Sequence, residues 1–259
     1  MDITRAQLII NYINNYTFAT VKELCDEFHV SSATMRRDLA SLEQQGQICR
    51  VHGGARKIIS ELQRTGISYD TRIRNAVKEK EAIANYASSL IEPNDTVFFD
   101  SSTTVLKITE ILIHRQIHAT VITNDFFIAN MINNSSNLDL IFIGGYVEKD
   151  YLYTKGLYAE EMLKNIYIHK AFIAFDNIDI SRGITMNCMS FVRFKQLALE
   201  HSSKKYAVGE HHKFKSESAY QICGLSDLDA VITDSGISDE IVHIYKSNKC
   251  RLLTAPILE

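Results

Sequence analysis

The chain has 259 residues, of which 46% are hydrophobic, and a formal net charge of −3. This composition excludes wholesale disorder, and no apolar run approaches the roughly 20 residues that a membrane-spanning helix needs. The five cysteines are an odd, scattered number with no Cys-x-x-Cys pair, which indicates reduced thiols. Since the opening residues, Met-Asp-Ile-Thr-Arg, do not resemble a signal peptide, we expect a cytoplasmic protein with no membrane contact.

Three short amphipathic segments near the N-terminus predict three helices joined by tight turns. Each has apolar residues three or four positions apart, which is the spacing of one face of an α-helix. The connection between the second and third segments, His29-Val30-Ser31, is short, so the order is that of a helix-turn-helix module. The residues predicted to be buried are Leu8, Ile9 and Ile13 in the first segment, Val21, Leu24 and Phe28 in the second, and Met35, Leu39 and Leu42 in the third.

The third helix is predicted to direct basic side chains away from its apolar face. Ser31 or Ser32 precedes the apolar stripe and is a candidate N-cap. At about 100° per residue, Arg37 lies roughly 200° around the helix from Met35, and Arg36 flanks that outer face. Arginines on such a face suit the major groove of DNA, where they bind guanine edges or phosphates. A solvated surface without a partner is the alternative for a pattern of this kind.

A two-stranded wing is predicted after the third helix. Residues Ile48–Val51 alternate like a strand, His52–Gly54 form a turn, and Ala55–Ile58 return. Residues 30–57 contain five basic and two acidic side chains, whereas residues 1–57 as a whole have an excess of only one positive charge. Positive charge therefore gathers on the third helix and the wing of an otherwise acidic chain, which favours one-sided contact with DNA.

These residues resemble the N-terminal signature of DeoR-type transcription regulators. The resemblance rests on Ser-Ala-Thr-Met-Arg-Arg-Asp-Leu at residues 32–39, then Glu43-x-x-Gly46, then Arg-x-His-Gly-Gly-Ala at residues 50–55. This ordered combination is far more specific than a generic helix-turn-helix pattern, and it implies a double-stranded DNA operator as partner. The candidate DNA-contacting residues are Ser32, Thr34, Arg36, Arg37, Arg50, His52 and Arg56.

A domain boundary is predicted where the apolar periodicity lapses after Lys57. We expect a winged helix-turn-helix domain over residues 1–57, a linker over residues 58–76, and an effector-binding and oligomerisation domain over residues 77–259. From Thr96 onward, short apolar runs alternate with amphipathic stretches, which predicts an α/β fold with a mostly parallel sheet. The expected helices span residues 77–91, 103–113, 126–132, 159–165, 191–201 and 239–246, and the expected strands span residues 96–99, 118–123, 138–143, 171–175, 206–209, 230–233 and 251–253.

Polar loops follow several of these strands, and in such folds ligands bind outside the carboxyl ends of the strands. Asp100–Thr104 places hydroxyl groups before a helix N-terminus, an arrangement that favours an anion such as phosphate. Ordinary helix capping by Ser and Thr is the alternative. The remaining loops are Thr123-Asn124, Gly144-Gly145 and Gly209–Phe214, for which a simple turn and a surface lysine, Lys213, are the competing interpretations.

Taken in order, these loops resemble the C-terminal sensor domain of the same family, so the resemblance covers nearly the whole chain. It implies a fold related to sugar-phosphate isomerases and amino-sugar-phosphate deaminases, and a phosphorylated sugar as effector. Ser101, Thr103, Thr104 and Lys213 would hold the phosphate, and Asp100, Asn124 and Asp176 would meet sugar hydroxyls. The full set of implied effector-binding residues is Asp100, Ser101, Ser102, Thr103, Thr104, Asn124, Gly144, Gly145, Asp176 and Lys213.

The chain departs from the family pattern around this site. Ser102 replaces the usual glycine of the phosphate loop, and Glu210 lengthens the usual aspartate. Phe175 and Asn177 stand beside Asp176 where small residues are usual, and residues 187–194 lack the usual acidic residue. These changes indicate a pocket that is smaller, more apolar or tuned to a different effector.

We therefore expect a sequence-specific transcription regulator, a repressor of carbohydrate-metabolism genes, whose affinity for DNA responds to a phosphorylated sugar. The resemblance also implies a homo-oligomer, a dimer or a tetramer. No cofactor is expected, and no metal, because His211-His212 lacks a third ligand at a recognisable spacing. One alternative is an isomerase- or deaminase-like enzyme that uses Asp100 and Asp176 as acid and base. Another is a DNA-binding scaffold whose pocket has decayed.

Overall fold

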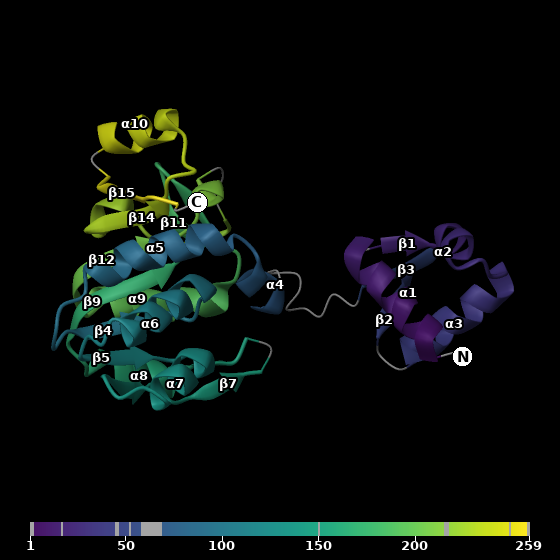
Figure 1. Cartoon of the computed structure of the whole chain (residues 1–259), viewed down its shortest axis with the longest axis horizontal. Helices are drawn as coiled ribbons and strands as arrows, with labels where there is room; N and C mark the ends of the chain where they lie inside the picture. Colours follow the sequence, from purple (N-terminus) through teal and green to yellow (C-terminus); the bar gives the residue numbers. More distant parts are fainter. Residues whose placement is uncertain are drawn as a thin grey trace. The chain divides into compact units, whose positions relative to one another are not determined.

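The computed structural model describes residues 3–16, 18–44, 47–51, 53–57, 69–149, 151–214, 218–248 and 250–257. The chain divides into two compact units, residues 1–66 and residues 67–259, each with a hydrophobic core of its own (Figure 1). Among the described residues, no helix combines the length and the apolar character needed to span a bilayer.

The N-terminal unit is a winged helix-turn-helix, as expected, but its sheet has three strands in the antiparallel order β1-β3-β2. The additional strand, β1, pairs with β3 far along the chain, and a three-residue segment gives too little alternation for a prediction. The elements of this unit are α1 (Ile3–Tyr16), β1 (Phe18–Thr20), α2 (Val21–Phe28), α3 (Ser32–Gln44), β2 (Ile48–Val51) and β3 (Gly54–Lys57).

The core of this unit confirms most of the predicted apolar stripes. Met35, Leu39 and Leu42 of α3 are buried against residues of α1 and α2. The assignment of Leu8 to the core was wrong, because its side chain is 50% exposed while Ile9, the next residue and therefore about 100° further around α1, is fully buried. A small core of this kind can bury only one narrow face of each helix.

The C-terminal unit is built on a seven-stranded sheet in the order β15-β14-β12-β9-β4-β5-β6, in which every pair of neighbours is parallel. The predicted α/β class is confirmed. The helices are α4 (Tyr69–Arg74), α5 (Val77–Ser89), α6 (Thr103–His114), α7 (Phe126–Asn133), α8 (Leu157–Lys164), α9 (Val192–Glu200) and α10 (Asp239–Ser247), with 3-10 turns η1 (Met189–Phe191), η2 (His211–Lys213) and η3 (Leu225–Asp227). The strands are β4 (Thr96–Phe99), β5 (Ala119–Thr123), β6 (Leu138–Phe142), β7 (Tyr146–Glu148), β8 (Tyr153–Lys155), β9 (Ile168–Ala174), β10 (Asn177–Asp179), β11 (Gly183–Met186), β12 (Ser202–Val208), β13 (Tyr220–Cys223), β14 (Ala230–Asp234) and β15 (Leu252–Ala255).

Helices cover both faces of this sheet, so its strands are apolar on both sides (Figure 1). One face, which includes Val97 and Phe99, packs against α5, α6 and α7. The other face, which includes Phe98 and Ala171, packs against α8 and α9. The strand order changes direction between β4 and β9, because β5 and β6 lie on one side of β4 and the later strands lie on the other. Such a switch point is where open α/β sheets bind ligands.

Two small antiparallel sheets and one short helix were not predicted. The order β10-β11-β13 forms one sheet, and β7 pairs with β8 in the other. The short helix α4 lies within the stretch expected to be linker, so the C-terminal unit begins before the expected residue 77. Six helical residues are too few to show a periodic pattern, and their backbone is held by Lys80, as described below.

Candidate nucleic-acid surface and ligand site

Helix α3 of the N-terminal unit has an exposed face with two arginines. Ser31 accepts the N–H of Thr34 at 3.2 Å and is therefore the capping residue of the expected pair. Ser32, Arg36 and Arg37 are exposed, and Arg37 lies on the side of the helix opposite the buried stripe. The hydroxyl of Thr34 lies 2.9 Å from that of Ser31, so this side chain also takes part in the cap.

An ion pair that sequence reasoning missed anchors this helix. The guanidinium of Arg5 in α1 donates to the carboxylate of Asp38 in α3 at 2.9 Å, and Asp38 is buried. Asp38 belongs to the family signature, but no local sequence pattern predicts which basic residue pairs with it. This pair fixes the rotation of α3 about its axis, and so the direction of Arg36 and Arg37.

The wing is tied to α3 through Glu43. Its carboxylate accepts the backbone N–H of Arg50 at 3.1 Å, and the Arg50 guanidinium lies 3.8 Å from the same side chain. Arg56 belongs to β3, opposite Phe18 and Cys49, but nothing is described of its side chain. His52, the remaining candidate in the wing, lies outside the described residues.

In the C-terminal unit, the loop after β4 lies at the switch point of the sheet and leads into α6. Ser102 is the N-cap of α6, since its hydroxyl accepts the N–H of Val105 at 3.1 Å. Its φ of −157° is extended backbone that any residue adopts, so the absence of the usual glycine strains nothing here. The N–H groups of Thr103 and Thr104 have no acceptor within the helix and stay available to an anion.

Ser101 contacts the loop after β5 in this structure. Its hydroxyl donates to the carboxylate of Asp125 at 2.7 Å, so its one hydrogen is not available to a phosphate. Asp125 caps α7 by accepting the N–H groups of Phe127 and Ile128, and burial raises the pKa of this carboxyl. Ser101 therefore joins the loop after β4 to the one after β5.

Asp100 meets a lysine that sequence reasoning missed. Lys195 of α9 donates to Asp100 and, at 2.9 Å, to the carbonyl of Ala174, while Asp100 accepts the N–H of Ala174 at 2.9 Å. Burial lowers the pKa of Lys195, although Asp100 opposes that shift. The signal was present in the sequence, because Lys195 interrupts the apolar face of α9 between Phe191 and Ala198.

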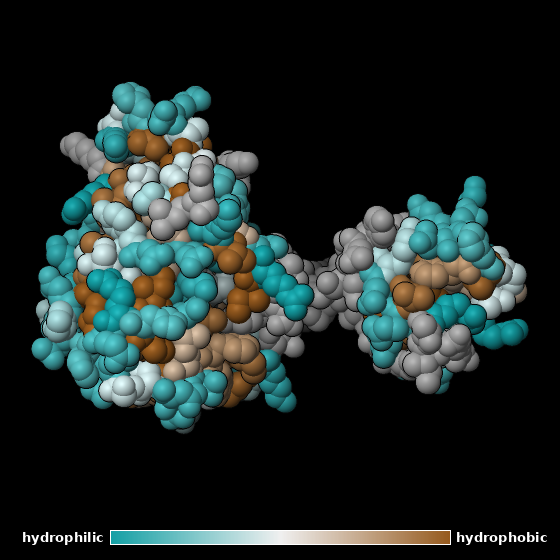
Figure 2. Space-filling view, in the orientation of Figure 1, coloured by the Kyte–Doolittle hydropathy of each residue, from teal (hydrophilic) through white to brown (hydrophobic). Residues whose placement is uncertain are grey.

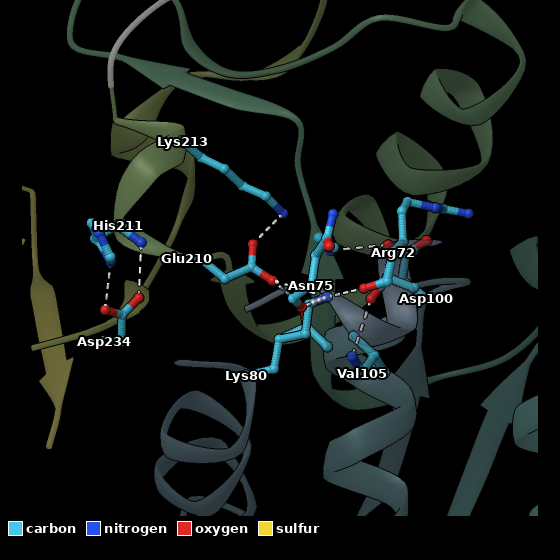
Figure 3. Close-up of polar contacts among 12 residues, drawn as sticks. Arg72, Asn75, Lys80, Asp100, Val105, Glu210, His211, Lys213 and Asp234 are labelled. Carbon is cyan, nitrogen blue, oxygen red and sulfur yellow. Dashed lines mark hydrogen bonds and ion pairs between the residues drawn. The ribbon is translucent and has the colours of Figure 1, made fainter. Parts of the chain in front are cut away.

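A second cluster of charges surrounds Glu210, at the end of β12 (Figure 3). Its carboxylate lies 2.8 Å from the ammonium of Lys213 and accepts the hydroxyl of Thr104 at 3.1 Å. Lys80 of α5 lies 3.8 Å away on the other side. Burial would raise the pKa of Glu210, but Lys213, reinforced by Lys80, lowers it to about 2. The expected phosphate ligand Lys213 is thus close to Thr104, with a carboxylate between them.

Lys80 connects this cluster to the start of the C-terminal unit. Its ammonium donates to the backbone carbonyls of Arg72 and, at 2.7 Å, of Asn75 (Figure 3). Its side chain is only 9% exposed, and burial lowers its pKa although Glu210 opposes that shift. The sequence alone did not identify Lys80. Helix α5 also contains Lys78, which is exposed, and no local pattern distinguishes the buried lysine from the exposed one.

The remaining predicted residues follow other strands at the same edge of the sheet. Asn124 follows β5 and donates to the carbonyl of Thr154 at 2.7 Å, whereas its buried Oδ1 has no hydrogen-bond partner among the described residues. Asp176 follows β9 and accepts the N–H of Asn187 at 2.8 Å. Gly144 and Gly145 follow the edge strand β6, two strands from β4, and are exposed.

Gly145 is required by its own chain. Its φ is +152°, and a Cβ there would lie 2.7 Å from the carbonyl oxygen of Lys155 in β8. This close approach of backbone to backbone explains the glycine without a ligand. A Cβ at Gly144 would meet nothing within 4 Å, so space does not require glycine at that position.

Aromatic side chains replace the acidic residue expected within residues 187–194. Phe191 stacks on Tyr153 with ring centroids 4.7 Å apart and meets Tyr151 edge-on at 5.5 Å. The guanidinium of Arg72 lies 5.3 Å from the centre of the Tyr151 ring. The Lys195 ammonium is 6.0 Å from the Phe191 ring. An apolar wall therefore borders the Asp100–Lys195 pair.

The two histidines that raised the question of a metal have other surroundings. His211 Nδ1 lies 2.6 Å from Asp234, and the same carboxylate accepts the N–H groups of His211 and Gly236. Burial lowers the pKa of His212. Over the described parts of the chain, no three His, Cys, Asp or Glu side chains gather closely enough to hold a metal ion.

An exposed arginine-bearing helix in a winged helix-turn-helix, joined to an α/β unit with a polar site, is the architecture of a DNA-binding transcription regulator. The family model described as the DeoR C terminal sensor domain matches residues 75–235, and that described as the DeoR-like helix-turn-helix domain matches residues 5–61. The chain therefore belongs to the DeoR family of transcription regulators.

Proteins that are similar over most of their length carry regulator names. The chain is 31% identical to the HTH-type transcriptional regulator YgbI of Escherichia coli, over 98% of each chain. It is 31% identical to the HTH-type transcriptional repressor GlcR of Bacillus subtilis, over 96% of this chain and 95% of that one. It is also 30% identical to a lactose phosphotransferase system repressor of Staphylococcus epidermidis, over 89% of this chain and 91% of that one.

Solved structures give weaker similarities. Ribose 5-phosphate isomerase A from Methanocaldococcus jannaschii has a TM-score of 0.39 and 11% identity, covering 52% of this chain and 53% of that one. The eIF2B beta structure from Chaetomium thermophilum has a TM-score of 0.47 and 14% identity, covering 66% of this chain and 54% of that one. Scores and identities this low say nothing about an activity of this chain.

Proposed function

We propose that this regulator represses genes of carbohydrate metabolism and that a phosphorylated sugar, bound at the switch point of the C-terminal unit, changes its affinity for the operator. The observation that carries the effector site is the meeting of Thr104, Lys213 and the N-terminus of α6 beside the junction of β4 and β9. The names of the GlcR repressor and the lactose phosphotransferase system repressor support repression in carbohydrate metabolism.

On the DNA side, we assign the major-groove contacts to α3. Arg36 and Arg37 are exposed, and the Arg5–Asp38 pair holds the helix that presents them. Ser32 lies at the exposed start of the helix, where its hydroxyl suits a phosphate of the DNA backbone. Arg50, His52 and Arg56 of the wing remain candidates for contacts with the DNA backbone.

On the effector side, the phosphate is assigned to three groups of donors. They are the N–H groups of Thr103 and Thr104, the hydroxyl of Thr104, and the ammonium of Lys213, whose side chain is 20% exposed and thus accessible. Ser101 positions the loop and does not donate to the phosphate. The unpartnered Oδ1 of Asn124 supports the assignment of this residue to a sugar hydroxyl, since buried polar atoms are rarely left unsatisfied.

The enzymatic alternative is less well supported. A sugar-phosphate isomerase or deaminase needs a carboxylate or imidazole that exchanges protons with the substrate. Asp100 accepts hydrogen bonds from Lys195 and a backbone N–H, and Asp176 accepts one from the N–H of Asn187. Both candidate bases are therefore already engaged within the chain. These contacts favour binding over turnover.

We also propose that the C-terminal unit assembles into a homo-oligomer. Large apolar side chains are exposed around the β7–β8 hairpin and α8, and Figure 2 shows apolar surface at this end of the unit, near α7 and β7. Exposed apolar patches of this kind mark interaction sites. The residues are Phe126, Phe127, Tyr146, Val147, Leu152, Leu157, Tyr158 and Met162.

The proposed function is tested with DNA from the promoter of the chain's own gene. Footprinting locates the operator, and gel shifts then measure operator affinity across a panel of sugar phosphates and the matching free sugars. We expect one phosphorylated sugar, and not its free sugar, to change operator affinity and to remain unconverted in a turnover assay. Turnover of the compound would favour the enzyme, and an operator affinity that no compound changes would favour the decayed pocket.

A further inference from the structure

The carboxylate of Glu210 lies where a bound phosphate would have to compete with it (Figure 3). It accepts from Thr104 at 3.1 Å and from Lys213 at 2.8 Å, and these are the side chains assigned to the phosphate. Glu210 is only 2% exposed, so its charge depends on these partners. The hydroxyl of Thr104 has one hydrogen and cannot donate to both anions, and two anions held side by side repel each other.

We propose that Glu210 is a built-in competitor of the effector's phosphate, and that Lys80 transmits the exchange to helix α4. The proposal rests on the phosphate site of the proposed function and adds to it the residue that opposes binding and the residue that carries the response.

The response follows from which cation remains near Glu210 once phosphate binds Thr104 and Lys213. Lys80, 3.8 Å away, is then the cation nearest to a buried carboxylate. A buried charge without a partner is strongly unfavourable, so Lys80 moves closer to Glu210. An ammonium has three hydrogens, and at present Lys80 gives two of them to the carbonyls of Arg72 and Asn75. The third hydrogen can serve Glu210, but the ammonium must move from 3.8 Å to hydrogen-bond distance, and this displacement lengthens the two bonds to the carbonyls.

Those carbonyls lie at the C-terminal end of α4, where the last carbonyls of a helix have no partners within it. Lys80 supplies the missing donors, so weaker bonds to Lys80 loosen the end of α4. This six-residue helix is too short to be stable by itself and depends on such contacts. It is also the first helix of the C-terminal unit along the chain, so a change there reaches the segment that leads to the DNA-binding unit.

The competition is tested by titrating inorganic phosphate into the full chain by calorimetry at constant ionic strength. We expect Glu210→Gln to bind phosphate roughly tenfold or more tightly than the wild type, because one like charge has been removed from a partly buried site. Glu240→Gln, which removes an exposed carboxylate on α10, is the matched control and should bind as the wild type does. If Glu210→Gln fails to fold, Glu210→Asp, whose shorter side chain reaches less far, should show the same direction.

The transmission is tested by hydrogen exchange of residues 69–76 with and without inorganic phosphate. We expect phosphate to speed exchange there in the wild type and in Lys78→Met, and to leave it unchanged in Lys80→Met while that variant still binds phosphate. This inference would be overturned if wild type and Glu210→Gln bound phosphate with equal affinity while Lys213→Ala weakened binding in both. That result would leave the proposed site intact. The proposed site would be overturned as well if Lys213→Ala left phosphate affinity unchanged, or if neither the wild type nor any variant bound phosphate. A response of residues 69–76 that persists in Lys80→Met would exclude Lys80 as the link.

Discussion

Lys195 and Asp100 form an ion pair inside the C-terminal unit, although 95 residues separate them in the sequence. Both side chains are almost completely buried, and each also bonds the backbone of Ala174. The pair therefore fastens α9 to the carboxyl ends of β4 and β9, at the junction where the strand order changes direction. It gives the floor of the proposed effector site a fixed geometry.

Replacing Lys195 with methionine should strongly destabilise the C-terminal unit. The buried carboxylate of Asp100 would lose its cation, which typically costs about 3–5 kcal/mol of unfolding free energy. Chemical denaturation followed by circular dichroism measures the change. Lys204→Met breaks the exposed pair with Asp229 and should lower the stability much less, because water already screens that pair. Equal stability of the two variants would contradict the stabilising role assigned to the Lys195–Asp100 pair.

The double variant Arg36→Ala/Arg37→Ala should lose specific operator binding and keep its fold. An arginine that binds a base edge contributes about 1–3 kcal/mol of discrimination, whereas one that binds a phosphate mainly changes the salt dependence by roughly one unit of slope. Gel shifts at several salt concentrations separate these cases. Lys78→Ala/Lys149→Ala removes the same charge from exposed positions of the C-terminal unit and should bind nearly as the wild type does. Wild-type operator affinity in the arginine variant would contradict the assignment of α3.

Lys213→Ala should reduce the ratio between the operator affinities measured with and without the phosphorylated sugar. The variant lacks one charge-assisted bond to the phosphate, while its DNA-binding unit is untouched. In the wild type, we expect the effector to change operator affinity by roughly 5–150-fold, the usual range of coupling between two sites. Fluorescence anisotropy with labelled operator DNA follows both quantities. A variant that responds as the wild type does would place the effector elsewhere.

The protein should be a dimer or a tetramer at micromolar concentration, assembled through residues beyond Lys57. One small winged module contacts too little DNA to select a single site in a genome, and two linked modules raise the effective concentration. Light scattering coupled to size exclusion measures the mass. Leu157→Glu/Tyr158→Glu should shift the protein toward monomer, and Ile244→Glu, at an exposed apolar position of α10, should not. A monomeric wild type, with and without DNA, would refute the assembly.

Glu210 should stabilise the fold in a pH-dependent way. Its pKa falls from 4.5 to about 2 on folding, so its contribution is fully present above pH 4.5 and is lost as the pH falls through about 2. The difference in unfolding free energy between wild type and Glu210→Gln should therefore stay constant from pH 7 to about 5 and shrink below that. Urea titrations at each pH measure it. A difference that grows on acidification would show that the carboxylate is not the favoured form.

Local patterns were sufficient for the class of fold and for the exposed, arginine-bearing face of α3. The stripe of Met35, Leu39 and Leu42 predicted α3 and the outward direction of Arg36 and Arg37, because helical periodicity depends only on neighbours in the sequence. Alternating apolar runs and amphipathic stretches predicted the parallel α/β sheet for the same reason. The polar loop at residues 100–104 was located because parallel strands place all their carboxyl ends at one edge.

Only the tertiary structure decided which charges meet at that edge. Lys195 pairs with Asp100, and Lys80 reaches both Glu210 and the end of α4, because strand order brings β4, β9 and β12 side by side. The short strands β1 and β13 pair only with strands distant in the sequence, so no local alternation predicted them. A side chain's own sequence neighbours fix its direction on a helix or strand, but its electrostatic partners come from whichever elements the folded core packs beside it.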